Sequence, residues 1–233
     1  MKSITTFLFC FTTLLCSGEH SRFLHDDWST HQPVLFAAAN TTKGPIIEFG
    51  CGYGSTDMLH EICAKEGRLL ISLDDHSDWL NRFATKYKDT PWHRFVHVPG
   101  KNYHQPEDPS HWICFLDTFE PLQSIEFDVC FIDQAPWLAR YETVKRVKDK
   151  ALFVIVHDVD YFARNHIFGS TIRPIQNRTP GIFDFSDLFR SFQVYFPHSP
   201  WPGDTGPPTL IASNRTSTLP AVDYTRPIVI NDP

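Results

Sequence analysis

Short apolar runs alternate with segments of helical spacing through the middle of the chain. The apolar runs cover residues 46–49, 69–73, 95–98, 127–132 and 151–156. Between them, apolar residues recur three and four positions apart, which predicts amphipathic helices over 55–65, 77–87, 112–119 and 136–148. Apolar runs that lack strict alternation and are separated by helices indicate parallel strands covered on both faces.

The pattern changes on either side of this core. Ser29 is a candidate N-cap for a helix over 30–39. Late in the chain, a helix around 185–191 precedes two apolar runs at 192–196 and 209–213. Two such adjacent strands favour an antiparallel hairpin at one edge of the sheet. We therefore expect an α/β fold with a seven-stranded, mostly parallel sheet, an antiparallel edge hairpin, and helices on both faces.

The first 18 residues have the pattern of a secretory signal peptide. Lys2 supplies a positive charge, and an apolar run of 13 residues covers 4–16. Cys16 and Gly18 place small residues before a cleavage site at Glu19. The alternative is an N-terminal helix of the domain. The signal-peptide interpretation predicts a protein of the secretory pathway or the extracellular space.

The remaining chain divides into one domain over 19–213 and an irregular extension over 214–233. No run after the leader reaches the ~18 apolar residues that suggest a membrane span. Asn40, Asn177 and Asn214 begin glycosylation sequons, which predicts a glycoprotein if the chain is exported by a eukaryote.

Composition and the remaining cysteines narrow the class of protein. A hydrophobic content of 42% with 21% charged residues excludes a disordered chain. The net charge of −6 disfavours a nucleic-acid partner, and we expect a small-molecule substrate instead.

The spacings of the four cysteines outside the leader fit no zinc pattern. Spacing leaves open whether Cys51 and Cys63 form a disulfide. These four are Cys51, Cys63, Cys114 and Cys130.

Polar residues and glycines collect at the expected carboxyl ends of the parallel strands, where open α/β sheets bind ligands. Glycines let a loop approach a ligand closely, and the next helix offers free N–H groups to an anion. An acid after the second strand suits the two hydroxyls of a ribose. The dinucleotide fingerprint GxGxxG is not met, because Ser55 occupies its third glycine position. The residues are Glu48, Gly50, Gly52, Gly54, Asp74, Asp75, Asp133, His157 and Asp158.

The segments 48–54, 73–75 and 127–133 together resemble the motifs of class I S-adenosylmethionine-dependent methyltransferases. The resemblance covers about residues 30–213 and implies a Rossmann-like fold with S-adenosyl-L-methionine as cofactor. It implies that Gly50, Gly52 and Gly54 line the methionine part of the donor, with Glu48 near its amino group. Asp74 then takes the ribose, and Asp75 is the alternative register.

Two segments depart from the family pattern. Pro99-Gly100 follows the third strand in place of the acid that often contacts adenine. Lys150-Ala151 replaces the usual glycine pair before the fifth strand. Both departures concern peripheral contacts rather than the fold.

Asp133, His157 and Asp158 are the candidate catalytic residues, since they end adjacent strands on the expected acceptor side. His157 is a candidate general base, and a histidine that is only hydrogen-bonded at a strand end is the alternative. Asp133 and Asp158 also resemble two ligands of the divalent metal in catechol-type methyltransferases. Val159 stands where that family has a third oxygen ligand, so we assign no metal ligands and favour a metal-free mechanism.

The leading function is methyl transfer to a small molecule, with oxygen as the expected acceptor atom. One rival is a secreted binding module that keeps the fold without catalysis, because S-adenosylmethionine is made in the cytosol. A second rival, a nucleotide-binding oxidoreductase, is disfavoured by the missing GxGxxG motif.

Overall fold

The computed structural model describes residues 29–101, 108–159, 188–195 and 207–223. The predicted signal peptide and the sequon at Asn177 lie outside the described residues. So does most of the helix predicted around 185–191, and the described residues 188–190 are not α-helical.

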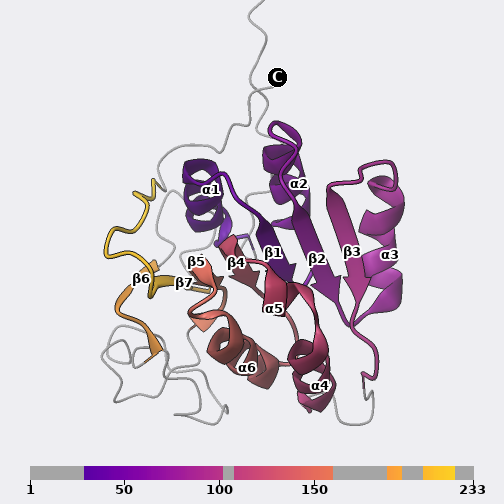
Figure 1. Cartoon of the computed structure of the whole chain (residues 1–233). Helices are drawn as coiled ribbons and strands as arrows, with labels where there is room; N and C mark the ends of the chain where they lie inside the picture. The colour runs from indigo at the N-terminus through magenta and orange to yellow at the C-terminus, as the bar shows by residue number, and fades with distance from the viewer. Residues whose placement is uncertain (1–28, 102–107, 160–187, 196–206, 224–233) are drawn as a thin grey trace, which may run out of the picture.

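The strands form one seven-stranded sheet in the order β3-β2-β1-β4-β5-β7-β6 (Figure 1). The β1–β5 strands are mutually parallel, whereas β7 runs antiparallel to both β5 and β6. This confirms the predicted sheet and its antiparallel edge hairpin. The bounds are β1 (Ile46–Phe49), β2 (Leu70–Asp74), β3 (His93–His97), β4 (Phe127–Ile132), β5 (Ala151–Val156), β6 (Ser191–Tyr195) and β7 (Thr209–Ser213).

Helices follow the strands as predicted, with two differences. The first helix begins at Gln32 with His31 as N-cap, so Ser29 is not its cap. Pro33 lies in the first turn, where its missing N–H costs nothing, and Ser29 instead closes a turn by accepting from Gln32 N. The short helix at residues 121–124 was not predicted. The bounds are α1 (Gln32–Thr41), α2 (Thr56–Ala64), α3 (Ser77–Lys86), α4 (Ser110–Thr118), α5 (Pro121–Ser124) and α6 (Trp137–Val147).

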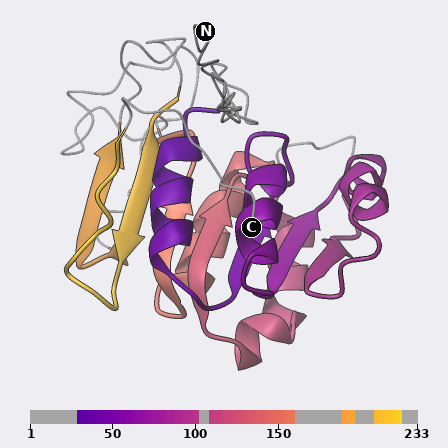
Figure 2. The ribbon, with the colours of Figure 1, turned by 90° about the horizontal axis from the view of Figure 1, so that it is seen from above.

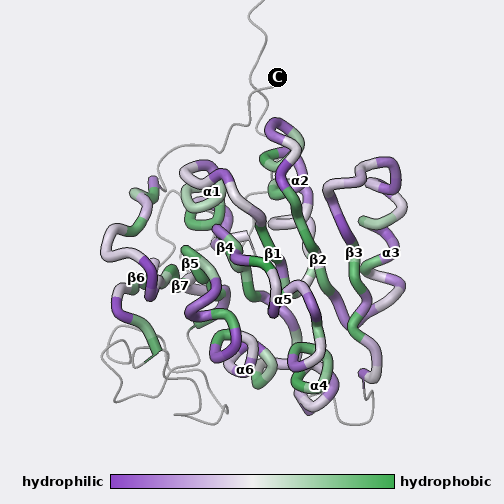
Figure 3. The backbone as a smooth tube through the Cα atoms, in the orientation of Figure 1, coloured by the Kyte–Doolittle hydropathy of each residue, from purple (hydrophilic) through white to green (hydrophobic). Residues whose placement is uncertain are grey.

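Each face of the sheet buries its own hydrophobic core. On one face, α1 and α2 pack against β1, β2, β4 and β5, and α3 covers β2 and β3. On the other face, α4 and α6 enclose the second core. Figure 2 shows the sheet between its helical layers, and Figure 3 shows hydrophobic residues concentrated along the central strands. Because both faces are covered, the strand ends are the accessible polar edge of the fold.

Several sequence expectations concern single side chains. Cys51, Cys63, Cys114 and Cys130 are all free thiols, so Cys51 and Cys63 are not paired. Asn40 is exposed at the end of α1, whereas Asn214 is engaged: its Nδ2 donates to Asp149 (2.8 Å) and to the Leu188 carbonyl (2.9 Å). Within the described ranges, no helix reaches the length and apolar content that crossing a membrane requires.

Candidate functional site

A cavity of about 380 Å³ lies at the carboxyl ends of β1, β2 and β4. This volume falls in the range of small-molecule sites, roughly 300–1,000 Å³. The strand order reverses between β1 and β4, which is where open α/β sheets bind ligands. Of the predicted site residues, Gly50, Asp74, Asp75 and Asp133 line the cavity. Glu48, Gly52, Gly54, His157 and Asp158 do not.

Close contacts with neighbouring residues, as well as its own turn, constrain the glycine loop after β1. Gly50 has a φ of +92°, and a Cβ there would lie 2.7 Å from backbone atoms of Asp133 and Gln134. Any side chain at Gly50 would therefore push the β1 and β4 loops apart. Gly52 has open space, with Ser55 Oγ 3.7 Å from an ideal Cβ, whereas a Cβ on Gly54 would meet the His31 ring at 3.1 Å.

Asp74, the last residue of β2, joins the two loops that border the cavity. Its Oδ2 accepts from Cys51 N (2.9 Å), and its Oδ1 accepts from His76 N (2.8 Å). Burial raises the pKa of this carboxyl, and the two N–H donors oppose the rise. Each oxygen keeps a second lone pair, so Asp74 can still accept hydrogen bonds from a ligand.

The Asp75 carboxylate makes more contacts with other side chains than the Asp74 carboxylate does. Its Oδ1 pairs with Lys101 Nζ at 2.7 Å. Its Oδ2 lies 2.9 Å from His111 Nε2 and accepts from Trp112 Nε1 at 3.3 Å. These contacts hold the segment after β3 and the start of α4 against the end of β2. Asp75 therefore organises the wall of the cavity.

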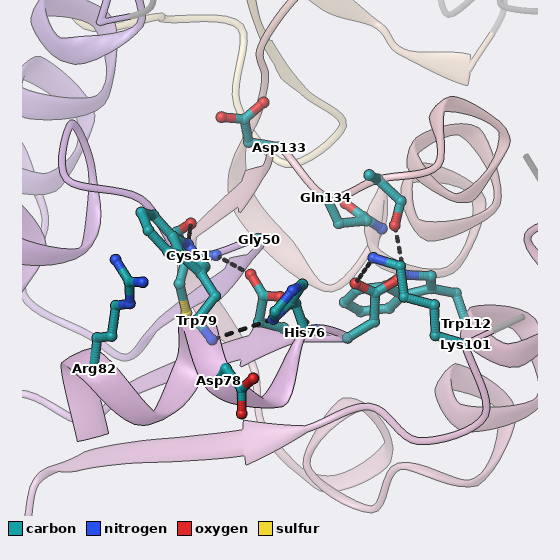
Figure 4. Close-up of a pocket in the computed structure, with 13 residues that line it drawn as sticks. Gly50, Cys51, His76, Asp78, Trp79, Arg82, Lys101, Trp112, Asp133 and Gln134 are labelled. Carbon is teal, nitrogen blue, oxygen red and sulfur yellow. Dashed lines mark hydrogen bonds and ion pairs between the residues drawn. The ribbon is translucent and has the colours of Figure 1, made fainter. Parts of the chain in front are cut away.

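Aromatic and basic side chains complete the cavity, and the sequence analysis did not single them out. Figure 4 shows Trp79 and Arg82 of α3 on one side and Lys101 and Trp112 on the other. Trp79 Nε1 donates to the Cys51 carbonyl (2.7 Å), and the Arg82 guanidinium lies 5.1 Å from the centre of the Trp79 ring. A usable signal was present: Trp79 and Arg82 sit one turn apart on the helix that follows the acidic pair.

Glu48 lies inside the protein and supports the glycine loop. Its Oε2 accepts from Thr56 Oγ1 (3.0 Å) and from Ser72 Oγ (2.7 Å). Thr56 Oγ1 in turn accepts from Gly52 N (2.9 Å). Burial raises the pKa of Glu48 to about 7, although the neighbouring hydroxyl donors oppose the rise. Thr56 thus links the buried acid to the glycine loop.

Arg140 of α6 bridges the two carboxylates that resemble metal ligands. Nη2 lies 2.9 Å from Asp133 Oδ1, and Nη1 lies 3.0 Å from Asp158 Oδ2. The same guanidinium donates to the backbone carbonyls of Asp133, Gln134 and His157. A cation bridging Asp133 and Asp158 would have to displace this fixed positive group. Asp158 itself has a φ of 53°, a region that Asp tolerates better than most residues.

His157 is 3% exposed and hydrogen-bonded on both ring nitrogens. Nδ1 lies 3.2 Å from Asp133 Oδ1, and Nε2 lies 3.1 Å from Thr30 Oγ1. Burial lowers the pKa of His157, but the charges of Asp133 and Asp158 outweigh burial and raise it. Burial also opposes ionisation of Asp133, yet His157 and Arg140 bring its pKa down to about 2. The neighbouring carboxylates therefore favour the protonated form of His157, which lies beside the cavity-lining Asp133.

His31 packs against this group from the start of α1. Its ring lies 4.5 Å from that of His157, centre to centre, and is 3% exposed. Burial, reinforced by the charge of His157, lowers the pKa of His31 to about 3, so the ring is neutral. The sequence analysis missed both His31 and Arg140. The available signal for Arg140 was a basic residue one turn into the helix after Asp133.

Comparisons with known proteins identify the fold of this chain. No family model matches the chain, and no curated protein does so. The O-methyltransferase TomG from Streptomyces achromogenes, solved with S-adenosylmethionine, superimposes with a TM-score of 0.52 at 16% identity, covering 78% of each chain. This chain has the class I methyltransferase fold. The fold predicted from the sequence motifs is thereby confirmed.

Two other solved structures match less closely. A protein from Thermobifida fusca YX, described as a putative methyltransferase, matches at a TM-score of 0.47 and 11% identity, covering 78% of this chain and 77% of the other. WbdD matches at 0.42 and 15% identity, covering 79% of this chain and 38% of WbdD. The chain thus spans about two fifths of WbdD.

Proposed function

We propose that this protein is an S-adenosylmethionine-dependent methyltransferase whose donor binds in the cavity at the ends of β1, β2 and β4. The observation that carries the proposal is that the glycine loop and Asp74 border one cavity in a methyltransferase fold. TomG, which shares the fold, was solved with this donor. Gly50, Asp74, Asp75 and Asp133, four of the nine residues that the sequence motifs suggested, line this cavity.

The contacts of the two neighbouring acids favour Asp74 over Asp75 as the ribose ligand. Asp74 accepts one backbone hydrogen bond on each oxygen, which leaves one lone pair on each for a ribose hydroxyl. Asp75 has three protein contacts and one remaining lone pair. Two adjacent hydroxyls therefore fit Asp74 better.

The charge of the cavity suits the donor. Asp74, Asp75, Asp78 and Asp133 all line it, so carboxylates outnumber the basic pair Arg82 and Lys101. A sulfonium and an ammonium are both favoured near carboxylates, while a cationic side chain can receive the donor carboxylate. Trp79 offers aromatic surface to the adenine ring, whereas Trp112 is fully buried behind the cavity wall.

We further propose a small-molecule acceptor that is methylated at oxygen, with Asp133 as the residue that contacts it. Methyl transfer breaks the donor carbon–sulfur bond and forms a carbon–oxygen bond, and S-adenosylhomocysteine leaves. The acceptor hydroxyl gives its proton to water, because Asp133, with a pKa of about 2, is too weak a base to keep it. Asp133 lines the cavity as a carboxylate and can orient that hydroxyl. His157 and Asp158 do not line the cavity, and we assign them the positioning of Asp133 and Arg140. This mechanism needs no bound metal.

Calorimetric titration of S-adenosylmethionine tests the proposal. The wild-type chain should bind one donor. Gly52 does not itself line the cavity, but the resemblance places the methionine part of the donor against it, so the branched side chain of Gly52→Val should abolish binding. The variant should stay folded, because the nearest atom to the added Cβ is Ser55 Oγ at 3.7 Å. Asp74→Ala should weaken binding about 10- to 100-fold, equivalent to about 1–3 kcal/mol. Asp117→Ala, which removes an exposed carboxylate on α4, is the matched control and should bind as the wild type does.

The same titration distinguishes the methyltransferase from the alternative, a non-catalytic binding module. A wild-type chain that is folded and takes up no donor would support a secreted binding module with a methyltransferase fold. Equal binding by wild type, Gly52→Val and Asp74→Ala would show that the donor lies elsewhere.

We also propose export, with a mature N-terminus at Glu19. N-terminal sequencing of protein from a eukaryotic secretory host should begin at Glu19, and an intact Met1 would contradict export.

The exposed Asn40 is the expected glycan site. A glycan on Asn214 would have to break the hydrogen bonds of its Nδ2, so Asn40→Gln should remove the glycan mass and Asn214→Gln should not.

A further inference from the structure

Three metal-ligating side chains converge beside the donor cavity, from three separate parts of the chain. His31 is the N-cap of α1, Asp133 follows β4 and His157 follows β5. One ligand atom from each lies within 4.8 Å of the other two. The convergence differs from the predicted pair of Asp133 and Asp158, because it includes two imidazoles and only one carboxylate.

His31 is the unexplained member of this group. It is 3% exposed, and among the described residues neither ring nitrogen has a hydrogen-bond partner. Leaving a buried polar atom unpaired costs roughly 1–3 kcal/mol. Its ring faces that of His157 edge to face, at 4.5 Å between centres. A bound cation would give the neutral ring the partner that the protein does not.

His157 is held in the orientation that a metal ligand needs. Thr30 Oγ1 donates its single hydrogen to the Pro207 carbonyl at 2.6 Å. It must therefore accept from His157 Nε2–H at 3.1 Å, which keeps a hydrogen on Nε2. Nδ1 then faces Asp133 and is the atom available for a ligand bond. Fixing one ring nitrogen through a hydrogen bond is how proteins orient metal-binding imidazoles.

Asp133 retains a free oxygen for the same purpose. The side-chain contacts of its carboxylate with His157 and Arg140 both fall on Oδ1. In the described part of the chain, Oδ2 has no hydrogen-bond partner. Arg140 also binds Asp158, so it fixes both carboxylates.

We propose that His31, Asp133 and His157 bind one divalent transition-metal ion, with Zn²⁺ as the probe. Two imidazoles and one carboxylate suit Zn²⁺, Co²⁺ or Fe²⁺, whereas Mg²⁺ prefers an all-oxygen set. Binding exchanges a proton for the ion: the hydrogen on His157 Nδ1 leaves to solvent, and the Nδ1 lone pair bonds to the metal. The site shares Asp133 with the proposed acceptor contact, but its test needs no methyl donor, so a failure of the metal site would leave the proposed function standing.

Titration of Zn²⁺ into the wild-type chain, in two buffers of different ionisation enthalpy, tests the site. We expect one ion per chain and a release of about one proton per ion. Mg²⁺ at millimolar concentration should not bind. His31→Gln should lower the Zn²⁺ affinity at least 10-fold, whereas His97→Gln, which changes an exposed histidine at the end of β3, should leave it unchanged.

Co²⁺ absorption on the wild type keeps the test valid if His31→Gln fails to fold. Bound Co²⁺ with nitrogen and oxygen ligands should show visible d–d bands that Zn²⁺ removes. No bands and no Zn²⁺ heat in the wild type would overturn the proposal. Equal affinities in wild type and His31→Gln would overturn it as well, because the ion would then lie elsewhere.

Discussion

Glu48 is a buried carboxylate and Asp133 a half-buried one, and they lie at the ends of neighbouring strands. Their pKa values move in opposite directions. Glu48 has neutral hydroxyl donors and no cationic partner among the causes of its shift; burial, reinforced by the charge of Asp133, raises its pKa to about 7. Asp133 also meets burial, but His157 and Arg140 lower its pKa to about 2. The partner charge, rather than the depth of burial, decides the protonation state.

The β1 side and the β4 side of the site therefore use their acids differently. On the β1 side, an acid that can hold a proton supports a glycine loop through Thr56. On the β4 side, an acid that stays ionised is clamped by a cationic group and faces the cavity. The first arrangement supports the glycine loop, and the second fixes a negative charge beside the proposed acceptor.

The largest expected effect comes from removing the guanidinium. Arg140→Met leaves the Asp133 and Asp158 carboxylates without their shared cation, and breaking a buried pair in this way costs about 3–5 kcal/mol. Arg146→Met, on the same helix but half-exposed, should cost about 1 kcal/mol or less. Urea unfolding of the two variants measures the difference. Equal losses would show that Arg140 does not clamp the β4 side.

A somewhat smaller effect concerns the pH dependence of stability. Between pH 4.5 and about 7, the unfolded chain has lost the Glu48 proton while the folded chain keeps it. The free energy of unfolding therefore falls as the pH rises through this window, and the Glu48 contribution is constant above it. A pKa rise of this size corresponds to about 3 kcal/mol at about 1.4 kcal/mol per pH unit.

Glu48→Gln should remove that dependence. The difference in unfolding free energy between wild type and Glu48→Gln isolates Glu48 from histidines that titrate in the same window. It should shift in favour of the variant as the pH rises from 4.5 to about 7. Parallel profiles for the two proteins would mean that Glu48 is ionised in the folded state, like Asp133.

The smallest effect tests the link between Glu48 and the glycine loop. Thr56→Val keeps the side-chain shape but removes the hydroxyl that joins Glu48 to Gly52 N, at a cost of about 1–2 kcal/mol. Donor affinity should fall several-fold, and Thr56→Ser should restore it. Calorimetry of the three proteins checks this. Full donor affinity in the folded Thr56→Val variant would show that Glu48 does not act through the loop.

Much of the fold could be predicted because its strands are covered on both faces. Continuous apolar runs gave the observed bounds of β1, β4, β5 and β7, and the glycine loop followed β1 as expected. The start of α1 was misplaced because Ser29 and Thr30 resemble caps. The deciding feature was Pro33, which fits the first helical turn.

The sequence predicted that the candidate residues lie at one edge of the sheet, but not which of them are accessible. The rule that ligands bind at strand ends brought Asp74, Asp133 and His157 to one edge of the sheet. It gave no sign that Arg140 turns back to clamp Asp133, or that His31 packs on His157. These contacts join distant parts of the chain and depend on the direction of each side chain. Local pattern contains no such information.

The structure of the wild-type chain crystallised with S-adenosylmethionine tests the central claim most directly. We predict that the donor occupies the cavity between the glycine loop and α3, with both ribose hydroxyls within hydrogen-bonding distance of the Asp74 carboxylate. We also predict that its methyl group is directed toward Asp133. A donor that is bound outside this cavity, or a cavity that stays empty at saturating donor concentration, would contradict the account.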